Sequence, residues 1–140
     1  MVKRCAALLL LTLVAGIAAG CGGDGDSDRE ALGACGDAPA EIAQQPTLPD
    51  GFPTPDGVIY TAEREAGPSH IVEGYRDGDL EDAFDAYKEA FDTAGYDVTK
   101  DEREADDAEV NFAGGASTGQ VKLEQHCEDR TSIEITIRPE

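Results

Sequence analysis

The side chains that could act as nucleophiles or general bases are few and do not form a catalytic pattern. After residue 20 the chain contains four serines and two histidines, His70 and His126. Ser69 directly precedes His70, but neighbouring residues of a strand point to opposite faces, so the two side chains do not converge. No serine lies in a G-x-S-x-G sequence, and the Gly-rich stretch 113–116 lacks the lysine of a phosphate-binding loop. We therefore predict a protein that is not an enzyme and that needs no cofactor.

Carboxylates dominate the composition. The 140 residues include 30 Asp and Glu but only 11 Lys and Arg, which gives a formal net charge of −19. A surface with this charge repels phosphate groups. We therefore exclude nucleic acid and an anionic membrane surface as partners held by charge. The acids are spread along the chain rather than gathered at ligand spacings, so we predict no metal site and interpret the acidic run 101–107 as solvated surface. A docking face for a basic partner and loose binding of divalent cations are the alternatives.

The first twenty residues have the features of an export signal. A short basic start, 1–4, is followed by the apolar run 5–20, in which Thr12 is the single polar residue. Sixteen apolar residues fall short of the roughly 20 that span a bilayer. We therefore predict a cleaved signal peptide over residues 1–20.

The residues that end this segment, Ile17-Ala18-Ala19-Gly20-Cys21, resemble the lipobox of bacterial lipoproteins. The resemblance covers residues 1–23. It implies that Cys21 becomes the first residue of the mature protein, carries acyl chains through a diacylglyceryl group, and anchors the protein to the exported side of the cell membrane. Cleavage would leave nine basic and 30 acidic residues, a formal charge of −21. An ordinary secretory signal and a retained membrane anchor are the alternatives.

This resemblance also bears on the four cysteines. With Cys5 in the signal and Cys21 acylated, Cys35 and Cys127 would share an exported compartment in which disulfides persist. We therefore expect a Cys35–Cys127 disulfide, worth about 4 to 5 kcal/mol in the chain-entropy model. Two free or intermolecular thiols are an alternative. A metal site shared with His126 is another, although adjacent strand residues face apart.

The elements that must position these residues follow from composition and periodicity. Residues 21–45, rich in Gly, Asp and Ala, predict a flexible acidic tether, and residues 46–140 a small globular domain that starts with a stiff, Pro-rich lead-in. A helix is predicted over 79–94, with Asp79 as N-cap and Gly95 as left-handed C-cap. Its apolar residues recur at i, i+3, i+4 and i+7: Leu80, Ala83, Phe84, Tyr87, Ala90, Phe91 and Ala94.

Alternating apolar residues predict strands before and after this helix. The expected ranges are 58–63, 70–76, 96–99, 109–113, 120–127 and 131–138, with a longer, mobile Gly-rich turn over 113–119. Ile133, Ile135 and Ile137 alternate with polar residues, which indicates one buried and one solvated face. The predicted fold is α+β, in the order ββαββ(ββ): an antiparallel sheet of five to six strands, covered on one face by a single helix.

The uncovered sheet face is the predicted interaction surface. Its candidate residues are Lys122, Glu124, His126, Glu134, Thr136 and Arg138. The expected function is a membrane-anchored binding or interaction module, with the lipid bilayer reached through Cys21 and an envelope protein as a candidate partner. A small-ligand or divalent-cation site between helix and sheet is the alternative, and a small enzyme is a further one.

Overall fold

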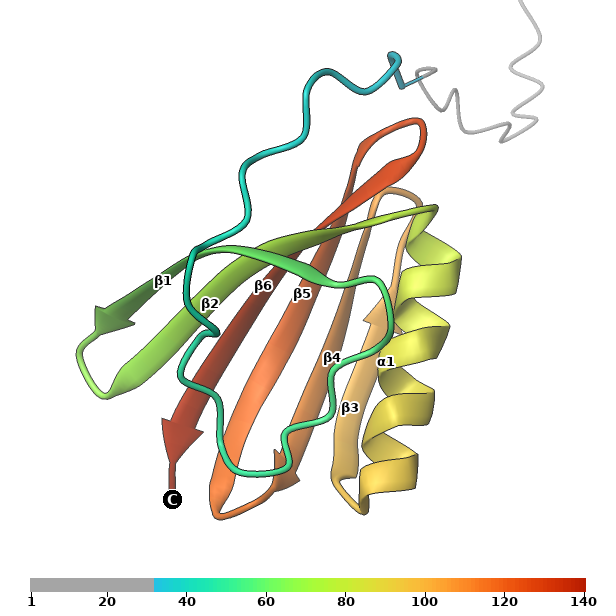
Figure 1. Cartoon of the computed structure of the whole chain (residues 1–140). Coiled ribbons are helices and arrows are strands. Elements are labelled where there is room, and N and C mark those ends of the chain that lie inside the picture. Colours follow the sequence, from blue (N-terminus) through green and yellow to red (C-terminus); the bar gives the residue numbers. More distant parts are fainter. Residues whose placement is uncertain (1–31) are drawn as a thin grey trace, which may run out of the picture.

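One antiparallel sheet and one helix form the domain (Figure 1). The structure, a computed structural model, describes residues 32–140. The elements are β1 (Ile59–Ala66), β2 (Ser69–Asp77), α1 (Leu80–Ala94), β3 (Asp97–Arg103), β4 (Asp107–Gly114), β5 (Ser117–Cys127) and β6 (Arg130–Pro139). Neighbouring strands pair in the order β1-β2-β6-β5-β4-β3, and every pairing is antiparallel. The predicted α+β architecture with a single helix is confirmed.

Helix α1 has the ends that its sequence predicts. The Asp79 side chain accepts a hydrogen bond from the Asp82 N–H at 2.8 Å, and Gly95 ends the helix in the left-handed region at φ 75°. The helix buries its apolar side against β3, β4 and β5. Its Phe91 ring stacks on Phe112 of β4, with ring centroids 4.8 Å apart.

The Pro-rich lead-in, residues 46–58, covers part of the same sheet face, and we call it the strap. Its Phe52 ring packs edge-on against Phe91 of the helix and Phe112 of the sheet, at centroid distances of 5.7 and 5.4 Å. Ahead of the strap, Ile42 donates its N–H to the carbonyl of Tyr60 at 2.9 Å. Helix and strap together therefore enclose the core, while the other sheet face stays open (Figure 1).

The β4–β5 connection differs from the prediction. Instead of a longer turn over 113–119, the two strands meet at a two-residue turn formed by Gly115 and Ala116, with φ values of 59° and 57°. Positive φ at both central residues is the geometry that matches the twist of a tight hairpin. Gly119 belongs to β5, where it pairs with Phe112 and Ile137. A Cβ there would collide with the Thr136 carbonyl and come within 2.6 Å of the Phe112 ring.

Strand β3 is longer than predicted, reaching Arg103 instead of residue 99. It takes in part of the acidic run that the sequence indicated as solvated surface. Cross-element ion pairs hold it beside the helix, since Lys88 contacts Asp101 at 2.6 Å and Arg103 contacts Glu81 at 2.9 Å. An exposed, charged edge strand of this kind also discourages pairing with other chains.

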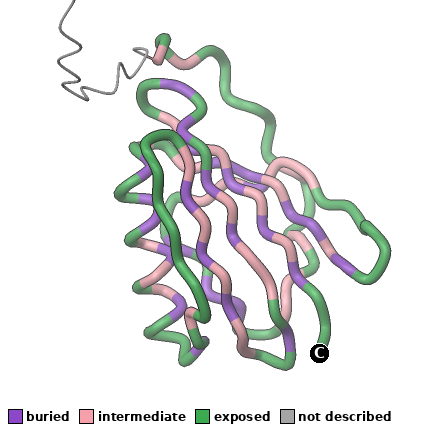
Figure 2. The backbone as a smooth tube through the Cα atoms, turned by 180° about the vertical axis from the view of Figure 1, so that it is seen from behind, coloured by how far each residue is buried: buried purple, intermediate pink, exposed green. Residues whose placement is uncertain are grey.

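The open face shows the expected alternation. In Figure 2, buried positions alternate with partly exposed ones along the strands. In β6 the predicted residues Ile133, Ile135 and Ile137 are buried, and the intervening residues face solvent more fully.

Candidate functional site

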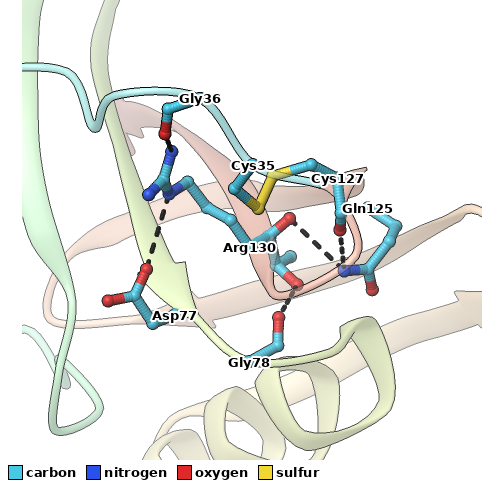
Figure 3. A network of polar contacts seen from close by, with 8 residues as sticks. Cys35, Gly36, Asp77, Gly78, Gln125, Cys127 and Arg130 are labelled. Carbon is cyan, nitrogen blue, oxygen red and sulfur yellow. Dashed lines mark hydrogen bonds and ion pairs between the residues drawn. A yellow bond between two sulfur atoms is a disulfide. The ribbon is translucent and has the colours of Figure 1, made fainter. Parts of the chain in front are cut away.

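The predicted disulfide is present and lies at the β5–β6 end of the sheet. Cys35 and Cys127 are bonded, with Cα atoms 5.1 Å apart (Figure 3). Gly33 and Gly36 accept hydrogen bonds from the Glu128 N–H and from Arg130 Nη1, at 3.1 and 3.2 Å. The residues around Cys35, which were assigned to the predicted tether, are thus attached to the domain. The predicted boundary at residue 45 remains a prediction.

A buried amide, which the sequence did not single out, connects this end to the helix. Gln125 Oε1 accepts the Leu80 N–H at 2.6 Å. Its Nε2 donates to the carbonyls of Cys127 at 2.7 Å and Arg130 at 3.3 Å, and Figure 3 shows these two bonds. The sequence did hold one signal of this role: Gln125 is a polar residue at a position that shares the buried side of the strand with Val121 and Leu123. The disulfide hairpin is therefore fixed to the first turn of α1.

The predicted interaction surface lies in shallow, polar depressions of the open face. Lys122, Glu124 and His126 line one depression, Glu134 lines a neighbouring one, and Thr136 and Arg138 line a third. His126 stands exposed at a bulge between Gln125 and Cys127.

The charges of this open face already have partners. Lys122 contacts Glu124 at 2.8 Å, Arg64 contacts Glu134 at 3.3 Å, and Arg138 donates to Ser69 Oγ at 2.9 Å. The lysine and arginine side chains of the predicted surface are thus occupied locally, and the six residues do not converge on one point.

A cleft on the other side of the molecule has a different character. It lies between the strap and the C-terminal half of α1 and has a volume of about 560 Å³. We call it the strap cleft, and its lining consists of residues 53–56 of the strap, Arg76 of β2, and Ala86, Glu89, Ala90, Thr93 and Ala94 of α1. The cleft combines apolar walls with charged groups of both signs.

Arg76 is the exceptional residue of the strap cleft. Its Nη1 is buried without a hydrogen-bond partner. Within residues 32–140, each other lysine or arginine has an ion pair or a side-chain hydrogen bond, whereas Arg76 has neither. Asp56 and Glu89 line the same cleft, but neither carboxylate lies within ion-pair distance of the Arg76 guanidinium. Buried polar groups are rarely left unpaired, so this guanidinium requires an explanation.

Two tyrosines, Tyr60 and Tyr87, lie close to residues that line the cleft. The Tyr60 hydroxyl lies 2.8 Å from Thr54 Oγ1 of the strap, and burial raises the pKa of Tyr60. Tyr87 is fully buried, its hydroxyl has no hydrogen-bond partner, and burial holds the pKa of Tyr87 well above its ordinary value of 10.0. The positive charge of Arg76 acts on Tyr87 in the opposite direction.

His70 belongs to a third region, at the far end of the sheet from the disulfide. Its Nδ1 lies 2.7 Å from Glu65 Oε1, and its Nε2 lies 3.2 Å from Glu63 Oε2, outside hydrogen-bonding geometry. Glu63 also accepts the Thr47 N–H at 2.9 Å. Since this cluster joins the start of the strap to the β1–β2 hairpin, we assign it a structural role.

The structure offers no support for a cation site within its described range. Among residues 32–140, no group of three or more His, Cys, Asp or Glu is arranged to hold a metal ion. No helix in that range has the length and apolar character needed to cross a membrane. Cys21 and the lipobox-like residues lie outside the described range, so acylation remains a prediction.

Comparisons with known proteins give no guide to the ligand. No family model, curated protein or solved structure matches this chain. The functional argument therefore rests on the chemistry of the strap cleft and on the lipobox-like residues.

Proposed function

We propose that this protein is a lipid-anchored binding module of the cell envelope, on the exported side of the membrane, and that the strap cleft is its binding site. The observation that carries the binding role is Arg76, which lines that cleft and whose Nη1 is buried without a hydrogen-bond partner. The anchor rests on the resemblance around Cys21.

The scarcity of cations makes the unpaired Arg76 informative. Residues 46–140 contain 24 acidic but only eight basic side chains. Acidic side chains outnumber basic ones threefold, and each of the other described cations has a partner. A buried polar atom without a hydrogen bond costs about 1 to 3 kcal/mol. Departures of this kind from a well-satisfied fold are typical of functional sites.

The disulfide defines which end of the domain would face the membrane and how far from the membrane the domain could lie. Only residues 22–34 separate Cys21 from Cys35, and thirteen extended residues span at most about 45 Å. The attachment point is the β5–β6 end of the sheet (Figure 1). The strap cleft lies along the side of α1, so a bilayer at that end would leave it accessible to ligands.

The anchor is tested by substitution of the acylated residue. Cys21→Ser should abolish lipid labelling and membrane retention, whereas Cys5→Ser, within the signal, should leave both unchanged. Normal retention of Cys21→Ser would refute the anchor.

The binding role is tested by thermal melting of the full-length protein in detergent against small carboxylates, primary amines and amino acids. Ligands that bind the folded state raise the melting temperature, and at equal concentration the tighter ligand raises it more. At least one class should raise it in the wild type and fail to do so in Arg76→Gln. If no class acts through Arg76, the strap cleft is not a binding site for small molecules.

A further inference from the structure

We propose that the ligand of the strap cleft is a small zwitterion with an apolar body, either an amino acid or a short peptide with free ends. Its carboxylate would pair with Arg76, and its ammonium group would lie near Asp56 and Glu89. This inference rests on the proposed function and adds the chemistry of the ligand.

The carboxylate half follows from Arg76. A guanidinium presents a planar fork of donors that matches a carboxylate with two parallel hydrogen bonds. Its Nη1 is buried without a partner, while the residue as a whole is only partly buried and lines the strap cleft. Gly57 of the strap lies next to this side chain without covering it by a side chain of its own, since a Cβ there would lie 3.8 Å from Arg76 Nε.

The ammonium half follows from the other charges of the cleft. Asp56 and Glu89 would repel a ligand that carried only negative charge, and the surrounding domain is strongly acidic. The last turn of α1, which borders the cleft, has no basic residue to offset the negative end of the helix dipole. A ligand with both charges satisfies the guanidinium and avoids this repulsion.

The size and apolar character of the ligand follow from the residues that form the walls of the cleft. Ala86, Ala90 and Ala94 recur at every fourth residue and so form one side of the groove, opposite Pro53 and Pro55. Eight helical residues rise about 12 Å, the length of three to four extended peptide residues. A volume of about 560 Å³ lies within the range of small-molecule pockets. Small apolar walls of this length suit a tripeptide or a shorter ligand.

The test compares ligands that share a body and differ in charge. Affinities of the full-length protein in detergent would be measured by calorimetry for leucine, the tripeptide Ala-Leu-Ala, its N-acetyl derivative and its C-terminal amide. The unblocked tripeptide or leucine should bind about tenfold more tightly than the C-terminal amide, which loses the pair to Arg76, and about threefold more tightly than the N-acetyl form, because Asp56 and Glu89 are exposed. The tighter of leucine and the tripeptide identifies the source of the zwitterion.

Variants assign the two charges to residues. Arg76→Gln should weaken the zwitterion about tenfold, and Glu89→Gln, at an exposed position, about threefold. Glu102→Gln makes the same charge change on β3, away from the cleft, and should change nothing. Because Glu89 is exposed on the helix, its variant keeps the test decisive even if Arg76→Gln folds poorly.

The outcomes separate the two proposals. Equal binding of the blocked and free forms, or an effect of Glu102→Gln as large as that of Glu89→Gln, would overturn the zwitterion. A plain carboxylate that binds through Arg76 while zwitterions do not would also overturn it, but would leave the proposed function standing. If no probe binds through Arg76, both proposals fail.

Discussion

The open sheet face and the strap cleft use the same kinds of residue in opposite ways. On the open face Lys122 lies 2.8 Å from Glu124, and Arg64 bridges to Glu134. In the strap cleft a cation and two carboxylates line one space without pairing, and a tyrosine hydroxyl behind them has no partner. The lysine and arginine side chains of the open face therefore have partners, whereas the cleft retains unused hydrogen-bonding capacity. In this domain, a charged side chain indicates a binding site only where it has no partner within the protein.

The largest expected effect concerns the disulfide, which attaches the segment preceding the strap to the end of β5. The paired substitution Cys35→Ala and Cys127→Ala opens a link between residues 92 apart, and we expect a loss of about 4 kcal/mol in the free energy of unfolding. Hydrogen exchange should rise mainly in the strap and in residues 33–45, with β4 and β5 less affected. Equal loosening of the central strands would contradict this division.

A second prediction contrasts two glutamines on one strand. Gln125→Ala should cost about 2 kcal/mol, because it leaves the Leu80 N–H and two carbonyls without their buried partner. Gln120 donates to Glu109 on the open face, and Gln120→Ala should cost under about 0.5 kcal/mol. Urea unfolding measures both values, and similar costs would show that the open face is as tightly bound as the helix end.

The two tyrosines give a third contrast. Tyr87→Phe should raise the free energy of unfolding by about 1 kcal/mol, because it removes a buried hydroxyl that has no partner. Tyr60→Phe should lower it by about the same amount, since that hydroxyl contacts Thr54. A loss in both variants would show that Tyr87 has a partner after all.

The pH dependence of Tyr87 sharpens this contrast. Since burial raises the pKa of Tyr87 in the folded state, the unfolded chain loses this proton first as the pH rises past about 10. The unfolded state then binds fewer protons than the folded state, so stability falls with rising pH. Unfolding curves at about pH 8 and about pH 11 should show a smaller loss for Tyr87→Phe than for the wild type.

The smallest effect is expected on the open face. Lys122→Gln and Glu124→Gln, alone and combined, should yield a coupling energy under about 0.5 kcal/mol, because exposed ion pairs contribute little. A coupling above about 1 kcal/mol in a double-mutant cycle would contradict the view that these charges are solvated surface.

Local signals in the sequence predicted much of the fold. Asp79 and Gly95 mark the helix because capping depends on a few neighbouring residues. The alternation around Ile135 marks a half-buried strand for the same reason. The β4–β5 turn was mispredicted because Ala116 adopts a positive φ, which glycine or asparagine would have signalled more clearly.

The strap cleft had no such local signal. Arg76 is an ordinary residue near the end of a strand, and its lack of a partner depends on where the strap and the helix lie in three dimensions. Alternation assigns the six predicted residues to the solvated phase of β5 and β6, but it says nothing about which charges pair. Pairing is set by side-chain geometry across strands, as between Arg64 and Glu134.

The stability of Arg76→Met tests the central claim most directly. If Arg76 is kept for a ligand and not for the fold, replacing its partly buried, unpaired charge with an apolar side chain of similar length should leave the free energy of unfolding unchanged or raise it by about 1 kcal/mol. Urea unfolding of the ligand-free variant beside the wild type provides the measurement. A loss of more than about 1 kcal/mol would show that Arg76 already serves the fold, and would contradict the account.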